Sequence, residues 1–192
     1  MSEAMIDAAA MMPPTQEADL YQKGIFLFMC PVDSDTCKEA IEFILKQNAE
    51  KKKKKRLQFL ICSPGGEVPP CFALIDIMKG SKIPIHTVGL GVIASCGLLL
   101  FITGEKGHRV LTPNTSILSH QYSWGNWGKE HELFAQVKEF ELSTKRMIEH
   151  YKKCTGLTEK QIREFLLPPE DVWLSAQESK KLGICDSVKS VY

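Results

Sequence analysis

Ser95 is a candidate nucleophile because of where it stands in the sequence. It follows an apolar segment and comes just before the apolar run Leu98–Ile102, which predicts a helix that begins next to the serine. The first turn of a helix presents unpaired backbone N–H groups and the positive end of the helix dipole, and both would stabilise an oxyanion. Gly97 would let the backbone pack closely there. A serine that only caps a helix would occupy the same place, so Ser95 alone does not decide between the two roles.

Three further segments carry groups that suit the same chemistry. Ser63-Pro64-Gly65-Gly66 follows an apolar segment, and its two glycines would allow backbone N–H groups to face a ligand. His120 ends another apolar segment at the edge of a loop, where an imidazole could face a cleft as a general base. Asp171 stands beside a bulky apolar stretch and could be held against that imidazole. Taken singly, each has a simpler explanation as a tight turn, a structural histidine or a helix cap.

Taken together and in this order, four blocks resemble the signature of the Clp (caseinolytic) protease proteolytic subunit, a family of serine peptidases. The blocks are Ser63-Pro64-Gly65-Gly66, Ala94-Ser95-Cys96-Gly97, Ser119-His120-Gln121 and Leu174-Ser175-Ala176. Their spacing also fits, and the resemblance covers roughly residues 20–190.

The resemblance implies a function for each matching residue. Ser95, His120 and Asp171 would form a catalytic triad, and the backbone N–H groups of Gly66 and Cys96 would form the oxyanion hole. A substrate would add as an extended strand to the backbone. The residues expected to bind that strand are Gly65, Glu67, Val68 and Gln121. The implied activity is hydrolysis of unfolded polypeptides and short peptides by a serine endopeptidase.

The resemblance also implies an α/β fold and an assembly. The fold would be Clp/crotonase-like, built of repeated ββα units, with a protruding handle helix over residues 129–154. The subunits would form heptameric rings, stacked as a tetradecamer around a chamber. No cofactor or metal is expected in the chain itself, and ATP would enter only through a partner AAA+ unfoldase.

Four features depart from the usual pattern of that family. The N-terminal segment does not show the residues that build an axial gate, two extra residues precede Asp171, and Glu170 stands where arginine is common. The cleft that receives the unfoldase usually carries aromatic residues, whereas the matching positions here are Gln58, Leu60 and Gly80. We therefore expect weak docking of a standard unfoldase on this subunit.

Two alternatives to an independent peptidase follow from these departures and from the fold. The chain could be a weakly active or regulatory subunit that mixes into a ring of a second Clp subunit. It could also be an acyl-CoA enzyme of the crotonase superfamily, but those enzymes rely on carboxylates and lack a serine–histidine pair. Reactivity of Ser95 toward a serine-directed phosphonate separates the first alternative from the peptidase, and an enoyl thioester assay tests the second.

Composition narrows the class of protein further. The 192 residues suffice for one domain with a sizeable core, expected over residues 20–192, with residues 1–19 as a flexible arm. The formal net charge of +1 gives no reason to expect a nucleic-acid partner, and no apolar run is long enough for a membrane span. The seven cysteines include no C-x-x-C pair and are expected to be reduced thiols in a cytoplasmic protein. The basic run Lys51–Lys55 is expected to be a solvated helix end and turn, and a docking patch for an acidic partner is the alternative.

Alternating apolar segments and helical periodicities define the elements that must position these groups. We expect strands over residues 24–29, 57–62, 84–90, 108–111 and 117–120, with helices between them. The helix after residue 36 should bury Ala40, Ile41, Ile44 and Leu45. The apolar helix over residues 98–102 should be central, because it is hydrophobic on all sides.

Overall fold

The structure is a computed structural model, and it describes residues 16–121, 125 and 127–191. Its centre is a mostly parallel sheet in which neighbouring strands follow the order β1-β2-β3-β4-β7, while β5 pairs with β3, and β6 pairs with β5. Within the described residues, only the β5–β6 pair is antiparallel. The strands are β1 (Ile25–Phe28), β2 (Leu57–Ser63), β3 (Ile85–Ala94), β4 (Arg109–Leu111), β5 (Ser116–Ser119), β6 (Val172–Ser175) and β7 (Ser187–Val188).

Strand β3 changes partner along its length. Its first half pairs with β4 over Thr87–Gly89, and its second half pairs with β5 over Val92–Ala94. Gly91 lies between the halves with a φ of 58°, a conformation that favours glycine. The carboxyl end of β3 therefore exchanges β4 for β5 on one side, while Ile93 stays paired with Ser63 of β2, and it leads directly into Ser95.

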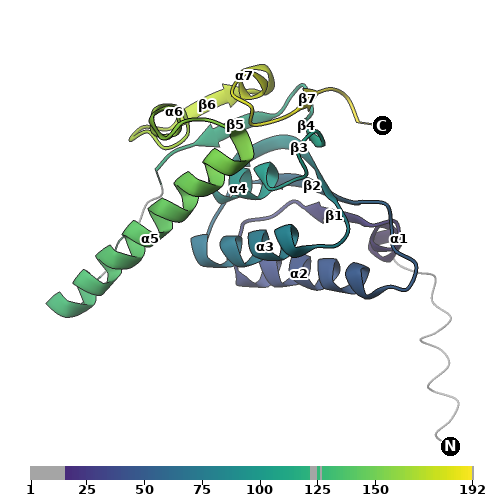
Figure 1. The fold of residues 1–192 in the computed structure, drawn as a ribbon, viewed down its shortest axis with the longest axis horizontal. Coiled ribbons are helices and arrows are strands. Elements are labelled where there is room, and N and C mark those ends of the chain that lie inside the picture. The colour runs from purple at the N-terminus through teal and green to yellow at the C-terminus, as the bar shows by residue number, and fades with distance from the viewer. Residues whose placement is uncertain (1–15, 122–124, 126, 192) are drawn as a thin grey trace, which may run out of the picture.

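The helices are α1 (Gln16–Gln22), α2 (Ser34–Ala49), α3 (Val68–Gly80), α4 (Cys96–Ile102), α5 (Glu130–Thr155), α6 (Glu159–Phe165) and α7 (Ala176–Lys181). Helices α2, α3 and α4 connect successive parallel strands, which need such crossover connections. Helices α2 and α3 lie side by side next to β1 and β2, and α4 lies between α3 and α5 (Figure 1). Every residue of α4 is buried, which confirms the predicted central helix. The predicted α/β class is also confirmed.

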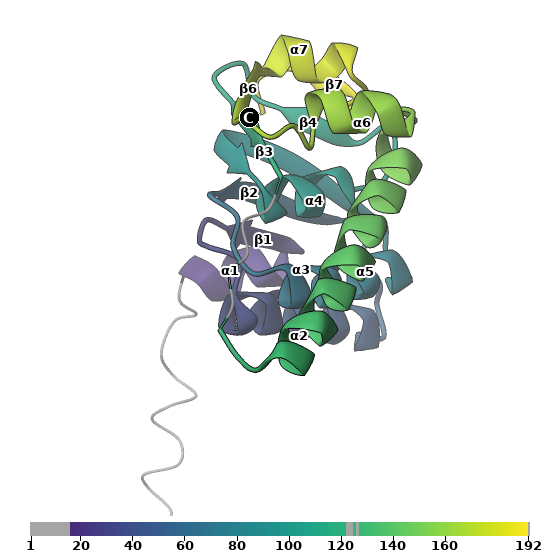
Figure 2. The same ribbon diagram turned by 90° about the vertical axis from the view of Figure 1, so that its left-hand side faces the viewer.

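Helix α5 extends well beyond the rest of the molecule (Figure 1), and Figure 2 views the molecule from the side toward which the helix projects. Its C-terminal half packs on the body through Met147, Ile148 and Tyr151, all of which are buried. Its N-terminal half carries apolar side chains in the open, among them Phe134, which is 67% exposed. This helix matches the one predicted over residues 129–154.

Three details differ from the expected elements. Leu45 is 53% exposed, because the buried face of α2 runs instead through Cys37, Ala40, Phe43, Ile44 and Gln47. Strand β6 was not expected, and β3 is longer than the predicted 84–90. Helix α1 covers the end of the predicted arm 1–19, of which residues 1–15 lie outside the described residues.

All seven cysteines are free thiols. Within the described part of the chain, no helix combines the length and the apolar character that a membrane span demands.

Candidate active site

Ser95 has a strained backbone. It is the residue between β3 and α4, and its φ of 51° and ψ of −122° make it the only non-glycine with positive φ among the described residues. Such conformations cost on the order of 1–3 kcal/mol and persist where the surroundings fix them. Here the fixing contacts are backbone bonds, from Ser95 N–H to the Leu118 carbonyl (3.0 Å) and from Leu98 N–H to the Ser95 carbonyl (2.9 Å).

The hydroxyl of Ser95 makes no capping hydrogen bond to α4, although the residue stands at the N-cap position. The simple alternative for this serine, a helix cap, therefore does not apply. Ser95 is half-buried and lines a cleft of about 660 Å³. His120 lines the same cleft, together with Pro64, Gly66, Glu67, Val68 and Pro69.

The turn after β2 lies directly against the start of α4. A Cβ on Gly65 would be 2.7 Å from the Ser95 Cβ and 3.0 Å from the Cys96 amide nitrogen, so only glycine allows this approach. Gly66 has a φ of 153°, and a Cβ there would be 2.1 Å from the Val32 carbonyl oxygen. The two predicted amide donors, those of Gly66 and Cys96, thus come from backbone segments in mutual contact.

Among the described residues, neither of those two amides donates to a backbone carbonyl, although the Gly66 backbone also hydrogen-bonds to the Cys96 thiol. The neighbouring groups do have partners, because Val32 N–H donates to the Gly65 carbonyl (2.9 Å) and Glu67 N–H donates to the Val32 carbonyl (2.7 Å). Gly65 and Glu67 were both expected to bind a substrate strand. The Gly65 carbonyl and the Glu67 N–H are therefore already hydrogen-bonded to Val32. Val68 lines the cleft.

The thiol of Cys96 is a second potential nucleophile beside Ser95. Its side chain is buried, and its Sγ donates to the Gly66 carbonyl at 3.2 Å. The hydrogen bond with Cys71 lowers the pKa of the Cys96 thiol, and burial opposes that change. Because the sulfur faces protein and does not line the cleft, the accessible nucleophile is the Ser95 hydroxyl.

His120 and Asp171 directly flank two neighbouring strands. Strand β5 ends at Ser119, which pairs with Val172 at the start of the antiparallel β6, so His120 follows one member of this last pair and Asp171 precedes the other. Beyond them, Gln121 N–H donates to the Pro168 carbonyl at 3.1 Å. The buried Ser119 hydroxyl also donates to the Leu166 carbonyl, which ties β5 to the end of α6.

The structure brings Ser95 and His120 into one cleft, but Asp171 is exposed and does not line it. Among the described residues, no hydrogen bond joins Ser95, His120 and Asp171. Sequence reasoning missed β6, although Val172-Trp173-Leu174 carries the β-branched and aromatic residues typical of a strand.

Comparison with known proteins agrees with this geometry. The profile of a family described as Clp protease matches residues 14–191. An ATP-dependent Clp protease proteolytic subunit 1 from Corynebacterium jeikeium is 32% identical over 169 residues, which cover 88% of each chain. An ATP-dependent Clp protease proteolytic subunit from Deinococcus radiodurans is 32% identical over 173 residues, 88% of this chain and 81% of the relative.

These matches confirm the resemblance that the four sequence blocks indicated, and the mostly parallel α/β sheet agrees with the Clp/crotonase fold. The chain belongs to the Clp protease family, as a homologue of its proteolytic subunits.

Proposed function

We propose that this chain is a serine endopeptidase subunit that cleaves unfolded polypeptides and short peptides. The observation that carries the proposal is Ser95 itself. Its backbone is held in a strained conformation, its hydroxyl is not used as a helix cap, and it shares a cleft with His120. Strain at a cleft residue is typical of functional sites.

In the proposed mechanism, the Ser95 oxygen attacks a peptide carbonyl carbon while His120 accepts the hydroxyl proton. The carbonyl oxygen becomes an oxyanion that the amides of Gly66 and Cys96 stabilise, and each such donor is worth about 10²–10³ in rate. His120 then gives its proton to the leaving amine, which leaves an acyl-serine that water hydrolyses. Asp171 would orient the imidazole and stabilise its positive charge.

This chemistry requires Asp171 to move into hydrogen-bonding distance of His120, because in the structure Asp171 is exposed and makes no hydrogen bond to His120. That observation favours a second candidate function, a weakly active subunit that completes its site only in a ring with another Clp subunit. The two candidates differ in one measurable respect, which is the activity of the purified chain alone.

The deciding experiment compares the wild-type chain with Ser95→Ala on a fluorogenic peptide and with a serine-directed phosphonate. We expect wild type to hydrolyse the peptide and to be labelled at Ser95, and the variant to do neither. Cys62→Ala is the matched control, since this half-buried thiol does not line the cleft and should be dispensable for labelling. Hydrolysis that persists in Ser95→Ala refutes the mechanism, and labelling without turnover favours the weakly active subunit.

Assembly follows from the exposed half of α5. Leu133, Phe134, Val137 and Leu142 leave apolar surface uncovered along this helix. Burial of such apolar surface stabilises an assembly by about 25 cal/mol per Å², so packing against the same helix of a second subunit would be favourable. We propose rings of seven subunits, stacked as fourteen. Sedimentation at micromolar concentration tests this, and a monomer would contradict it.

An ATP-driven unfoldase would be a partner only through the outer cleft at Gln58, Leu60 and Gly80. Gly80 is exposed, and a Cβ there would meet nothing within 4 Å, so the position offers no side chain as an anchor. Since a few buried apolar anchors dominate such affinities, we propose weak docking. Efficient degradation of a folded, tagged protein by this subunit, a standard unfoldase and ATP would overturn this.

A further inference from the structure

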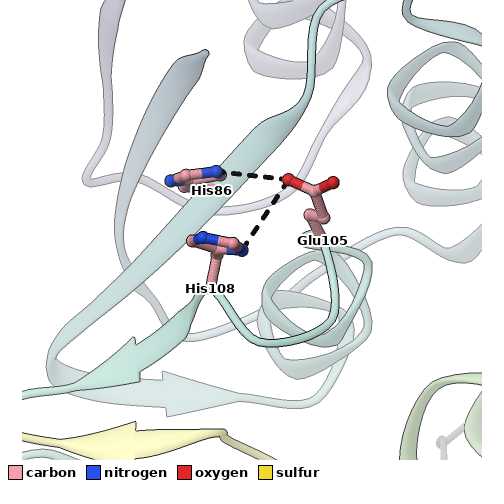
Figure 3. A group of neighbouring side chains, drawn as sticks. All are labelled: His86, Glu105 and His108. Carbon is pink, nitrogen blue, oxygen red and sulfur yellow. Dashed lines mark hydrogen bonds and ion pairs between the residues drawn. The ribbon is translucent and has the colours of Figure 1, made fainter. Parts of the chain in front are cut away.

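Two histidines and a glutamate meet at the opposite end of β3 from Ser95. His86 lies near the start of β3, Glu105 follows α4, and His108 comes just before β4 (Figure 3). One carboxylate oxygen, Glu105 Oε2, is 3.2 Å from His86 Nε2 and 3.8 Å from His108 Nδ1. One ligand atom from each residue lies within 4.8 Å of the other two.

The backbone holds these three residues in place. Glu105 N–H donates to the Ile85 carbonyl (2.8 Å), His108 N–H donates to the Glu105 carbonyl (2.9 Å), and Thr87 N–H donates to the His108 carbonyl (3.3 Å). These backbone hydrogen bonds join the segments that carry the three side chains, so His86, Glu105 and His108 are held close together. A metal site benefits from such prior positioning of its ligands.

An ion pair between the buried Arg109 and the partly buried Asp186 fixes the turn between Glu105 and His108. Asp186 accepts hydrogen bonds from the amides of Gly107 (2.8 Å) and Arg109 (2.9 Å), and it pairs with the Arg109 guanidinium at 2.6 Å. Gly107 takes a φ of 92°, which closes the turn. The loop that carries two of the three side chains is therefore not free to move away from His86.

The type and spacing of the donors suit zinc. Imidazole and carboxylate are ordinary zinc ligands, and donor atoms on a tetrahedral zinc with bonds of ~2.0–2.1 Å lie roughly 3.3 Å apart. The distances of 3.2 and 3.8 Å from Glu105 Oε2 to the two ring nitrogens lie close to that value. The rings are stacked with centroids 3.9 Å apart and planes at 19°, so binding requires them to tilt until both nitrogens face one point.

The surroundings leave the cluster accessible. His86 is half-buried, whereas Glu105 and His108 are exposed, so a cation can enter and keep open coordination positions for water. Burial and the neighbouring His108 lower the pKa of His86, and Arg56 acts in the same direction. The positive charge of Arg56 opposes a cation as well, which points to moderate affinity.

We propose that His86, Glu105 and His108 form a surface site for a single Zn²⁺ ion or a similar borderline divalent cation. The ion would take the place of the proton between His86 Nε2 and the Glu105 carboxylate, and each neutral ring would keep its one proton on the nitrogen that faces away from the ion. The site is separate from the cleft of Ser95, and it does not depend on the proposed peptidase function.

The test is calorimetric titration of Zn²⁺ into chelator-treated, full-length protein carrying Ser95→Ala, so that activity plays no part. We expect one site whose affinity falls at least about tenfold in His86→Ala and in His108→Ala, a loss of about 1.4 kcal/mol or more. Glu105→Gln should weaken it as well. The matched control is His131→Ala on the exposed face of α5, which should leave this site unchanged.

Cobalt provides a second readout, because its spectrum distinguishes nitrogen and oxygen ligands from thiolates. We expect Co²⁺ at this site to show no sulfur-to-metal band, and the visible bands to disappear in the double histidine variant. Thermal melts of each variant check that the fold is intact. Zinc binding that is unchanged without both histidines, or a thiolate spectrum lost on replacing cysteines, overturns the proposal.

Discussion

The pH dependence of stability should report on His150, a buried histidine of α5 that lies far from the cleft residues in sequence. Only 3% of the residue is exposed. Its Nδ1 is 2.9 Å from the Lys79 ammonium, which can only donate, so Nδ1 accepts and the ring proton stays on Nε2. Nε2 donates to the Leu99 carbonyl at 3.0 Å. The neutral ring thus joins α3, α4 and α5.

Burial, followed by the positive charge of Lys79, lowers the pKa of His150 from 6.5 to about 4. In the unfolded chain the ring takes up a proton as the pH falls below about 6.5, whereas the folded protein resists protonation until about pH 4. The stabilisation is therefore fully present above about pH 6.5 and is lost as the pH falls toward about 4. At 1.36 kcal/mol per pKa unit, the loss is on the order of 3 kcal/mol.

The experiment compares urea unfolding of wild type and His150→Gln from about pH 7 to about pH 4.5. Glutamine can donate to Leu99 and accept from Lys79 but does not titrate. The free-energy difference between the two proteins should shrink as the pH falls, with a slope of up to about 1.36 kcal/mol per pH unit. His131→Gln, an exposed change in the same helix, should run parallel to wild type. Parallel curves for His150→Gln as well would refute the assigned protonation state.

Three further changes test the packing around the site. Asp186→Asn should destabilise by about 3–5 kcal/mol in urea unfolding, because it leaves the buried Arg109 charge unpaired; a loss within the error of wild type would contradict the ion pair. Gly66→Ala should abolish phosphonate labelling, since its Cβ would stand 2.1 Å from the Val32 carbonyl oxygen and displace the turn; full labelling would show that the turn does not shape the cleft. Leu99→Ala should cost about 2–5 kcal/mol by opening a cavity in the buried helix α4, measured by the same unfolding; a neutral effect would mean that the core relaxes around it.

The local sequence pattern was sufficient to predict the elements that consist mostly of apolar residues. Strands β1 and β2 and helix α4 follow from their continuous apolar runs, and Ser63-Pro64-Gly65-Gly66 marks the turn that contacts Ser95. The four motif blocks then identified the family, which the comparisons confirm. The triad and the oxyanion hole themselves remain predictions.

Other features depend on contacts that no local pattern encodes. Strand β6 exists because it pairs with β5, more than fifty residues earlier, and its four residues are too short a segment to predict a strand without that partner. Leu45 was expected on the buried face of α2, but the helix is turned so that Phe43 and Gln47 face inward. His86 and His108 became neighbours only through the pairing of β3 with β4, which sequence spacing does not reveal.

The pair between Arg109 and Asp186 also has a consequence for the order of events at the ribosome. The two residues are 77 positions apart, so the arginine emerges long before its partner exists. At about 5–20 residues per second, the guanidinium waits roughly 4–15 s without its carboxylate. During that interval β4 also lacks β7, which closes its open edge. A nascent chain therefore holds Ser95 and His120 for some time before its sheet can close, so this part of the fold is completed only after Asp186 and β7 have been synthesised.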